Sequence, residues 1–461
     1  MRGREIRATS ALAAVFATRL LGLFIIYPVF AAYARHLKGA TPELIGFALG
    51  GYGLTQGLLQ IPMGLISDRI GRKVVIAIGL LFFAAGSAVA ALSTSIEGVL
   101  LGRILQGTGA VGSVVLALVA DSTREEVRTQ AMAFVGVTIG LSFLVAIGVG
   151  PPLAGAIGVP GIFWLTAVLA LLGIGITLGA VPAPPRLLHH RDTEALPALF
   201  SRVLRNRELL RLDFSIFALH AILTASFLAV PRLLSKTLKL TETGDWKFYL
   251  PVLVASIVLM VPAVILAEKG GRLKEVFLAA IAILGATLLA LAVRGDEAFV
   301  VIGAVVLFFS AFNTMESLLP SLVTRAAPAG AKGTATGIYS SSQFLGIFFG
   351  GAVGGWALGV GGLSAVFGFS VAVALVWLAF AARMRKPLRY KSYLAPLGPV
   401  EGQDIGALAA RLQAAPGVIE AAVAPEEGVA YLKIDASRFD ADAVARITGK
   451  EEPDAVAAAS S

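Results

Sequence analysis

The sequence predicts an all-α membrane protein that crosses the bilayer many times, with a small α+β domain at its C-terminal end. Three observations support this. Of the 461 residues, 57% are hydrophobic and 15% are charged, whereas soluble domains contain about 25% charged residues. Long apolar runs recur along most of the chain, and after residue 391 the composition returns to that of a soluble domain.

Twelve apolar runs are long enough to cross a bilayer, which requires roughly 20 mostly apolar residues in a helix. They divide six and six, so we expect an N-terminal half at 1–181 and a C-terminal half at 209–385. The runs are 9–35, 44–67, 74–93, 97–119, 129–156, 160–181, 209–233, 248–268, 274–293, 297–323, 332–359 and 362–382.

The distribution of basic residues predicts how the chain is oriented. Lys and Arg favour the cytosolic side of a membrane. With the N-terminus inside, the cytosolic ends and loops hold 24 of the 38 Lys and Arg, and the outer side holds seven. The first run lacks a small-residue cleavage site, so we expect a retained helix and not a removed signal peptide. We therefore predict a multi-pass protein of the inner (plasma) membrane with both termini in the cytoplasm.

Two segments outside the spans have their own patterns. Residues 182–208 are first proline-rich and then basic and amphipathic, which predicts a cytosolic linker with a short surface helix. Residues 386–461 predict a ferredoxin-like domain followed by a disordered tail. In this domain ALAARLQAAPG and DADAVARI indicate helices, and VIEAAVA and VAYLKID indicate a hairpin. With a strand near 392–398 the order is β-α-β-β-α.

Several classes of function lack the residues they need. The chain has no cysteine and four histidines, so disulfides, thiolate metal sites and cysteine nucleophiles are excluded and we expect no metal site. No G-x-x-x-x-G-K-[ST] loop occurs, so ATP hydrolysis is not expected. The net charge of +9 lies mainly at helix ends, which argues against a nucleic-acid partner. We expect neither an enzyme nor a bound cofactor.

Charged residues are concentrated in GLISDRIGRK, residues 64–73, between the second and third runs. The segment VILAEKGGRL, residues 264–273, repeats this pattern at an offset of 200, with Glu268 in the place of Asp68. Two parallel repeats of six helices are typical of secondary transporters, in which one half rocks against the other.

Two arginines lie inside predicted spans, where an ionisable group costs a few kcal/mol or more and marks a functional site by default. Arg19 lies about ten residues into the first run, or roughly 15 Å along a helix. It belongs either to the path of a substrate or coupling ion, or to a structural tether to backbone carbonyls. Arg103 lies near the start of the fourth run, so it is either a path residue or an arginine at the outer interface.

Three polar residues of the second half are further candidates. Glu316 is an acid well inside the tenth run, and Asn313 lies one turn earlier on the same face. Desolvation favours the protonated form of a carboxyl group, so Glu316 either carries a coupled proton or pairs with an arginine. His220, in the seventh run, is either a satisfied polar residue of the bundle or a proton site. Asp213 lies near the cytosolic end of that run, where we expect it to be solvated.

At residues 64–73 the chain resembles the major facilitator superfamily, whose loop between helices two and three has the pattern G-x-x-x-D-R-x-G-R-[RK]. The resemblance implies a latch in which Asp68 meets the N-terminus of helix eleven and Arg72 reaches Asp121. Such a latch would hold the cytosolic side shut. The residues that match the pattern are Gly64, Asp68, Arg69, Gly71, Arg72 and Lys73.

Two segments are similar to the drug:proton antiporter branch of this superfamily. LLGRILQGTGAVG resembles the pattern of helix four and contains Arg103. AIGVGPPLAG resembles the element G-P-x-x-G-G through Gly150, Pro151 and Gly155, and departs from it at Ala154.

The resemblance implies a monomeric, proton-coupled transporter in the lipid bilayer that exports a small apolar or amphipathic compound. Two alternatives fit the same residues: a membrane ligand sensor that signals through the C-terminal domain, and a solute:proton symporter. The tail resembles heavy-metal-associated domains in fold but lacks their C-x-x-C, because the chain has no cysteine.

Overall fold

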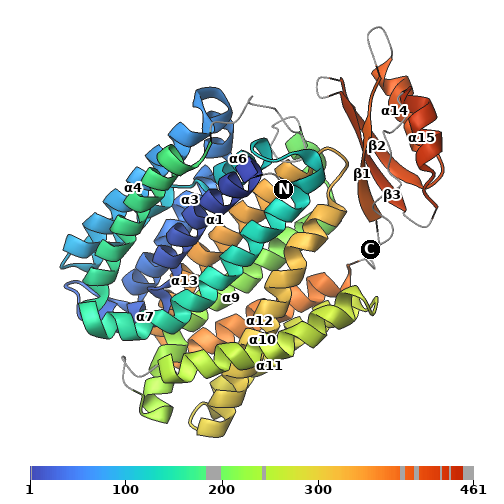
Figure 1. The fold of residues 1–461 in the computed structure, drawn as a ribbon. Coiled ribbons are helices and arrows are strands. Elements are labelled where there is room, and N and C mark those ends of the chain that lie inside the picture. The colour runs from blue at the N-terminus through green and yellow to red at the C-terminus, as the bar shows by residue number, and fades with distance from the viewer. Residues whose placement is uncertain are drawn as a thin grey trace.

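The computed structural model describes residues 1, 3–182, 199–240, 246–384, 390–398, 404–425, 428–435 and 438–449. Helices form one large bundle, and a small domain with a sheet lies beside the end of the bundle where the N-terminus lies (Figure 1). The predicted linker over 183–198 and the predicted tail over 450–461 fall outside the described residues.

Two very long helices settle the number of spans. Within the described residues, ten helices are long and apolar enough to cross a membrane, and two of these have 51 residues each: α7 (Glu125–Gly175) and α13 (Lys332–Ala382). A straight helix of that length would measure about 77 Å, against a hydrocarbon core of about 30 Å. Both helices are broken, at Gly158 in α7 and at 361–362 in α13. Eight single spans and two pairs make the predicted total of twelve.

The elements of each half follow the predicted runs closely. Two spans of the first half consist of two helices each, α1 with α2 and α5 with α6. The first half comprises α1 (Gly3–Phe24), α2 (Tyr27–Ala34), α3 (Pro42–Ile70), α4 (Arg72–Leu92), α5 (Ile96–Thr108), α6 (Gly112–Asp121), α7 and a π-helix, η1 (Ile176–Ala180). The short helix α8 (Phe200–Leu204) precedes the second half, which comprises α9 (Arg207–Leu238), α10 (Trp246–Glu268), α11 (Leu273–Arg294), α12 (Ala298–Ala326) and α13.

The two ends of the bundle can be told apart by their loops. The terminus-bearing end carries the N-terminus, the α3–α4 turn and the α12–α13 loop. The opposite end carries the α2–α3 loop. Near the opposite end, α3 of the first half packs directly on α13 of the second. A Cβ atom on Gly46 would lie 2.1 Å from the carbonyl oxygen of Gly351, and one on Gly53 would lie 2.5 Å from that of Phe344. Such backbone-to-backbone contact is possible only between small residues.

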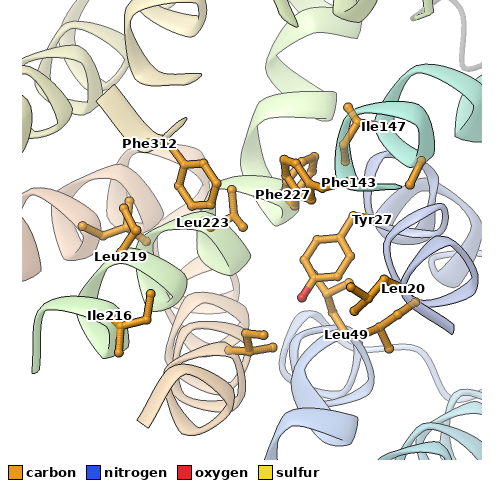
Figure 2. Packing of buried hydrophobic residues seen from close by; sticks show 14 of the residues in the cluster. Leu20, Tyr27, Leu49, Phe143, Ile147, Ile216, Leu219, Leu223, Phe227 and Phe312 are labelled. Atoms are coloured by element: carbon orange, nitrogen blue, oxygen red, sulfur yellow. The ribbon is translucent and has the colours of Figure 1, made fainter. Parts of the chain in front are cut away.

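Aromatic side chains fill the space between the halves farther into the bundle. The rings of Tyr27 and Phe227 have their centroids 5.2 Å apart, and those of Phe143 and Phe312 are 5.9 Å apart. Each pair joins the first half to the second. Figure 2 shows Tyr27, Phe143 and Phe227 close together between the helices of the two halves.

The C-terminal domain has the predicted element order, with its first strand beginning two residues earlier than expected. It comprises β1 (Tyr390–Pro396), α14 (Ile405–Gln413), β2 (Val418–Ala424), β3 (Val429–Asp435) and α15 (Ala441–Thr448). The three strands are antiparallel in the order β1-β3-β2. Both helices pack on one face of the sheet, where Leu412 and Val444 meet Leu432 in a small core (Figure 1).

Candidate functional site

Arg72 joins two carboxylates at the terminus-bearing end of the first half. The chain turns at Gly71, with φ 100°, and α4 begins at Arg72. Arg72 Nη1 donates to Asp68 Oδ1 at 2.7 Å, and its Nε donates to Asp121 Oδ2 at the end of α6. The side chains of Arg72 and Asp121 are only 3% and 1% exposed. This buried cluster ties the ends of the second, third and fourth spans together.

The other residues of the loop differ in their surroundings. Lys73 Nζ donates to the carbonyl oxygen of Val181, just after η1, whereas Arg69 is exposed. A Cβ atom on Gly64 would lie 3.5 Å from Ser113 Oγ, an ordinary van der Waals distance. Close approach of another helix therefore does not explain Gly64 in this conformation.

The second half contains a smaller version of the same arrangement. Gly271 adopts φ 69°, as Gly71 adopts a positive φ in the first half. Arg325 Nη2 donates to both oxygens of Glu268, at 2.9 and 2.7 Å, while Arg272 is exposed. Arg325 ends α12, the counterpart of α6. The second half thus has an arginine where the first has the acid Asp121.

Arg19 is buried between α1 and α3. Its Nη2 donates to Gln56 Oε1 at 2.5 Å, and its guanidinium carbon lies 5.7 Å from the ring centroid of Phe83. Arg19 Nε has no hydrogen-bond partner among the described residues. Buried donors without a partner are rare. The contacts of Arg19 are thus to side chains, and one donor is left for water or a ligand.

Arg103 is completely buried inside the bundle. Its Nε and Nη2 donate to the carbonyl oxygens of Ala48 and Leu49 in α3, at 3.3 and 3.1 Å. Its Nη1 donates to Gln106 Oε1 at 2.8 Å, and its guanidinium lies 4.3 Å from the ring centroid of Tyr52. These contacts fasten α5 to α3 within the first half.

Glu316 lies in the interior of α12, close to His220 of α9. Glu316 Oε2 is 3.9 Å from His220 Nε2, which is too long for a hydrogen bond. The Glu316 side chain is 39% exposed, yet its Oε2 is enclosed and has no hydrogen-bond partner among the described residues. Phe312, one turn away, contacts Phe143 of the first half. The carboxyl group therefore lies near the boundary between the halves.

The hydrogen bonds of His220 are those of a neutral imidazole. His220 Nδ1 lies 3.3 Å from the carbonyl oxygen of Ile216, so that nitrogen carries the proton. His220 Nε2 then accepts from the amide of Gln343, 2.9 Å away. Asn313 does not join this group, because its Nδ2 donates to Ser256 Oγ of α10 at 3.0 Å.

Two further polar residues of this region are buried, which the sequence did not indicate. Asp213 is 7% exposed, and its Oδ1 has no hydrogen-bond partner among the described residues, so the expectation that it is solvated was wrong. Tyr339 of α13 is also buried, and its hydroxyl oxygen has no hydrogen-bond partner among the described residues. The signal for Asp213 was an acid inside an apolar run. Tyr339 had no such signal.

The antiporter-like segment shapes helix packing. A Cβ atom on Gly150 would lie 2.4 Å from the carbonyl oxygen of Ile25 and 3.0 Å from the ring of Pro28. Gly150 therefore lets α7 approach the break between α1 and α2. Pro151 is buried beside it, whereas Gly155 is exposed. Among the described residues, no group of three or more His, Asp and Glu could hold a metal ion.

Comparison with known protein families decides the class of this bundle. The profile of the Major Facilitator Superfamily matches residues 12–350 and 214–407. The chain belongs to the major facilitator superfamily. A second profile, that of the YajR YAM domain, matches residues 399–441, within the C-terminal domain.

Individual proteins agree with this assignment. The inner membrane transport protein YajR of Escherichia coli (strain K12) is 42% identical over 445 residues, which cover 96% of this chain and 98% of YajR. Multidrug resistance protein 2 of Bacillus subtilis (strain 168) is 31% identical over 156 residues, or 33% of this chain and 38% of that protein. This facilitator is therefore a multi-pass inner-membrane transporter and not an enzyme.

The fold also matches the solved structure of another transporter. A bacterial homolog of the human lysosomal transporter Spinster, solved in an inward-facing and occupied conformation, superposes with a TM-score of 0.69 at 13% identity. The match covers 84% of this chain and 98% of that one.

Proposed function

We propose that this facilitator is a proton-coupled exporter of a small apolar or amphipathic compound. It works by alternating access, as a monomer, with the terminus-bearing end in the cytoplasm. Glu316 carries the coupled proton, and Arg19 and His220 line the path. Asn313 and Arg103 support the helices around this path.

The observation that carries this proposal is the position of the Glu316 carboxyl group. It lies in the interior of a membrane helix, near the boundary between the halves, with a partly exposed side chain and one unpaired oxygen. A charge at this depth costs a few kcal/mol or more, so gain and loss of a proton change the energy of the site. A proton that binds one state of the transporter more tightly than the other shifts the population toward that state.

Aromatic side chains beside Glu316 favour an apolar or amphipathic substrate. Phe312 lies one turn from the carboxyl group and contacts Phe143 across the boundary between the halves. Flat aromatic surfaces next to a single acid suit a compound with an apolar body. The similarity to a protein named for multidrug resistance, although it covers a third of this chain, supports export.

The buried cluster of the α3–α4 turn is the proposed conformational switch. We infer that the structure is the inward-facing form, because α3 and α13 touch backbone to backbone near the opposite end. The likeness to a transporter solved facing inward supports this. In the outward-facing form Asp68 would move to the N-terminus of α13, where an acid gains roughly 0.3–1 kcal/mol. The residues of this switch are Gly64, Asp68, Arg69, Gly71, Arg72, Lys73 and Asp121.

Vesicles that contain the purified protein test proton coupling. A pH gradient, acid inside, should drive accumulation of ethidium or of the neutral dye Nile red into the inside-out fraction. Replacing Glu316 by Gln keeps the shape and removes the titratable proton, so accumulation should fall to the level of protein-free vesicles. Ser317→Ala, at an exposed neighbour on α12, is the matched control. Undiminished accumulation by Glu316→Gln would exclude Glu316 as the coupling residue.

The same vesicles separate the alternatives. A symporter would accumulate the dye with the gradient reversed. A ligand sensor would bind the dye and show no accumulation in either direction. The buried ion pairs of Arg72 and the partly exposed pair of Glu268 with Arg325 favour a transporter, because a sensor does not need the same charged turn in both halves.

A further inference from the structure

The loop between α12 and α13 is buried although it lies at the surface of the bundle. All five residues 327–331 are buried, whereas loops normally run exposed over the surface. The C-terminal domain supplies part of the cover, because Ala329 forms an apolar cluster with Ala424 and Tyr431, whereas Ala327 and Ala331 pack in the core of the bundle. The partly buried residues around this cluster are Leu394, Ala422 and Val429.

The residues that cover the loop belong to one face of the domain's sheet. Side chains alternate between the two faces of a strand, and α14 and α15 pack on the other face. Figure 1 shows these two helices on the side of the sheet away from the bundle. We call the side of the sheet that α14 and α15 do not cover the docking face. It consists of Leu394, Glu420, Ala422, Ala424, Val429, Tyr431 and Lys433.

Glu420 connects the docking face to two parts of the membrane domain. Its Oε2 accepts a hydrogen bond from the backbone N–H of Ala329 at 3.2 Å. Its Oε1 accepts one from Arg202 of α8, the short helix that leads into the second half. A single carboxylate therefore holds the α12–α13 loop and the end of the linker at the same point. The pair with Arg202 is partly exposed, so its own contribution is small.

The remaining contacts fit the loop closely. Lys433 Nζ donates to the carbonyl oxygen of Ala327 at 3.3 Å. Burial lowers the pKa of the Lys433 ammonium group, against the opposing effect of Glu420. At Gly330, an added Cβ atom would lie 3.6 Å from the Cβ of Ala422. The docking face thus meets the loop through both polar and apolar contacts.

We propose that the docking face is a built-in regulator, which binds the α12–α13 loop and α8 and so favours the form seen here, with the terminus-bearing end open. The loop leads directly into α13, which the switch must approach when that end closes. A contact made in one form and lost in the other shifts the balance toward the first. The direction of this effect rests on the proposed function, since it assumes that Asp68 moves toward α13.

Disulfide trapping in the full-length chain tests the contact itself. The natural chain has no cysteine, so a double variant contains just two thiols. A Cβ–Cβ distance of about 3.5–4.5 Å suits a disulfide, and Gly330→Cys/Ala422→Cys meets this requirement. Because Gly330 has φ 70°, Ala329→Cys/Ala424→Cys provides a second pair without backbone strain. The control Gly330→Cys/Ile405→Cys places one thiol on α14, away from the docking face.

After mild oxidation in native membranes, both test pairs should lose reactivity with a maleimide-polyethylene glycol that is added in denaturing detergent. They should not form a dimer on a gel. The control pair should remain reactive. Failure of both test pairs to close, or their closure only between two chains, would overturn the docking contact.

Distances between spin labels test the regulation. Ile70→Cys and Thr324→Cys are exposed sites at the terminus-bearing ends of α3 and α12. Adding Glu420→Arg, which places a cation against Arg202, should raise the ratio of short to long distances about threefold, the size expected for a partly exposed charged contact. Asp442→Arg, the same charge change on exposed α15, should leave the distances unchanged.

An unchanged distribution in Glu420→Arg, or an equal shift in Asp442→Arg, would overturn the regulatory role even if the disulfides form. Neither measurement requires transport. Failure of the proposed proton coupling would therefore be seen separately, in the vesicle assay.

Discussion

Arg72 makes two contacts that require an arginine side chain. The guanidinium group has five N–H donors in a planar fork, and Arg72 uses separate nitrogens for Asp68 and Asp121. A lysine presents one compact ammonium group and cannot make the same pair of contacts. The match to the sequence pattern and the observed geometry agree at this residue.

Removing the Arg72 side chain should strongly destabilise the first half. Loss of one partner from a buried ion pair costs about 3–5 kcal/mol, because it leaves an uncompensated charge. We expect a clearly lower melting temperature for Arg72→Ala in detergent. Arg272→Ala, at the equivalent exposed position of the second half, should stay within about 0.5 kcal/mol of the natural protein. Equal losses in the two variants would contradict the buried role of Arg72.

A mutation of Gly64 should affect transport without lowering stability. A methyl group at this position would meet Ser113 at an ordinary contact distance, so Gly64→Ala should not lower the melting temperature. Transport should fall, because the outward-facing form brings α13 to this surface. Normal dye accumulation by Gly64→Ala in the vesicle assay would show that no helix comes close to Gly64 during the cycle.

At the scale of elements, the packing of α3 on α13 determines how the two halves meet near the opposite end. Their glycines place backbone against backbone, and the α12–α13 loop continues α13 at the other end, where the C-terminal domain covers it. The repeat within the sequence is visible here as well. Each half turns at a glycine with positive φ, but the ion pair that follows is built from different residues.

Enlarging a glycine of the α3–α13 contact should separate these helices. A methyl group on Gly46 would lie 2.1 Å from a backbone oxygen, so the helices must shift, and overpacking of this kind costs about 1–3 kcal/mol. Gly46→Ala and Gly351→Ala should therefore melt at lower temperature. Gly303→Ala, where no atom lies within 4 Å, should gain about 0.5–1 kcal/mol from helix propensity. A neutral result for Gly46→Ala would show that the contact is looser than described.

At the scale of the whole molecule, the terminus-bearing end holds the proposed switch, α8 and the C-terminal domain. Basic residues are concentrated on the same side, which predicts that this end lies in the cytoplasm. A transporter regulated by its own domain requires the domain, α8 and the moving loops on one side of the membrane. The arrangement of the described elements meets this requirement.

Reporter fusions test this orientation. A green fluorescent protein fused to the C-terminus should fluoresce, because it folds in the cytoplasm. Alkaline phosphatase inserted after Gly295, in the α11–α12 loop, should be active, because it needs the oxidising outer side. The reverse pattern would show that the chain has the opposite orientation and would require the direction of transport to be reassigned.

Sequence patterns alone were enough to predict the number of spans, their division into halves and the element order of the C-terminal domain. These features depend on the length and apolar content of each segment, which the bilayer and the sheet impose locally. The pairing of Arg72 with Asp121 was also expected, because the resemblance of residues 64–73 to the major facilitator superfamily implies it.

The contacts of each interior residue became known only from the packing of the helices. The fold encloses Arg103 against the backbone of α3, buries Asp213 and Tyr339, and places the docking face on the α12–α13 loop. Nearly every face of a membrane helix is apolar, so periodicity does not reveal which helix lies opposite. These contacts depend on how segments that are distant in the sequence pack together, and a local sequence pattern does not predict that packing.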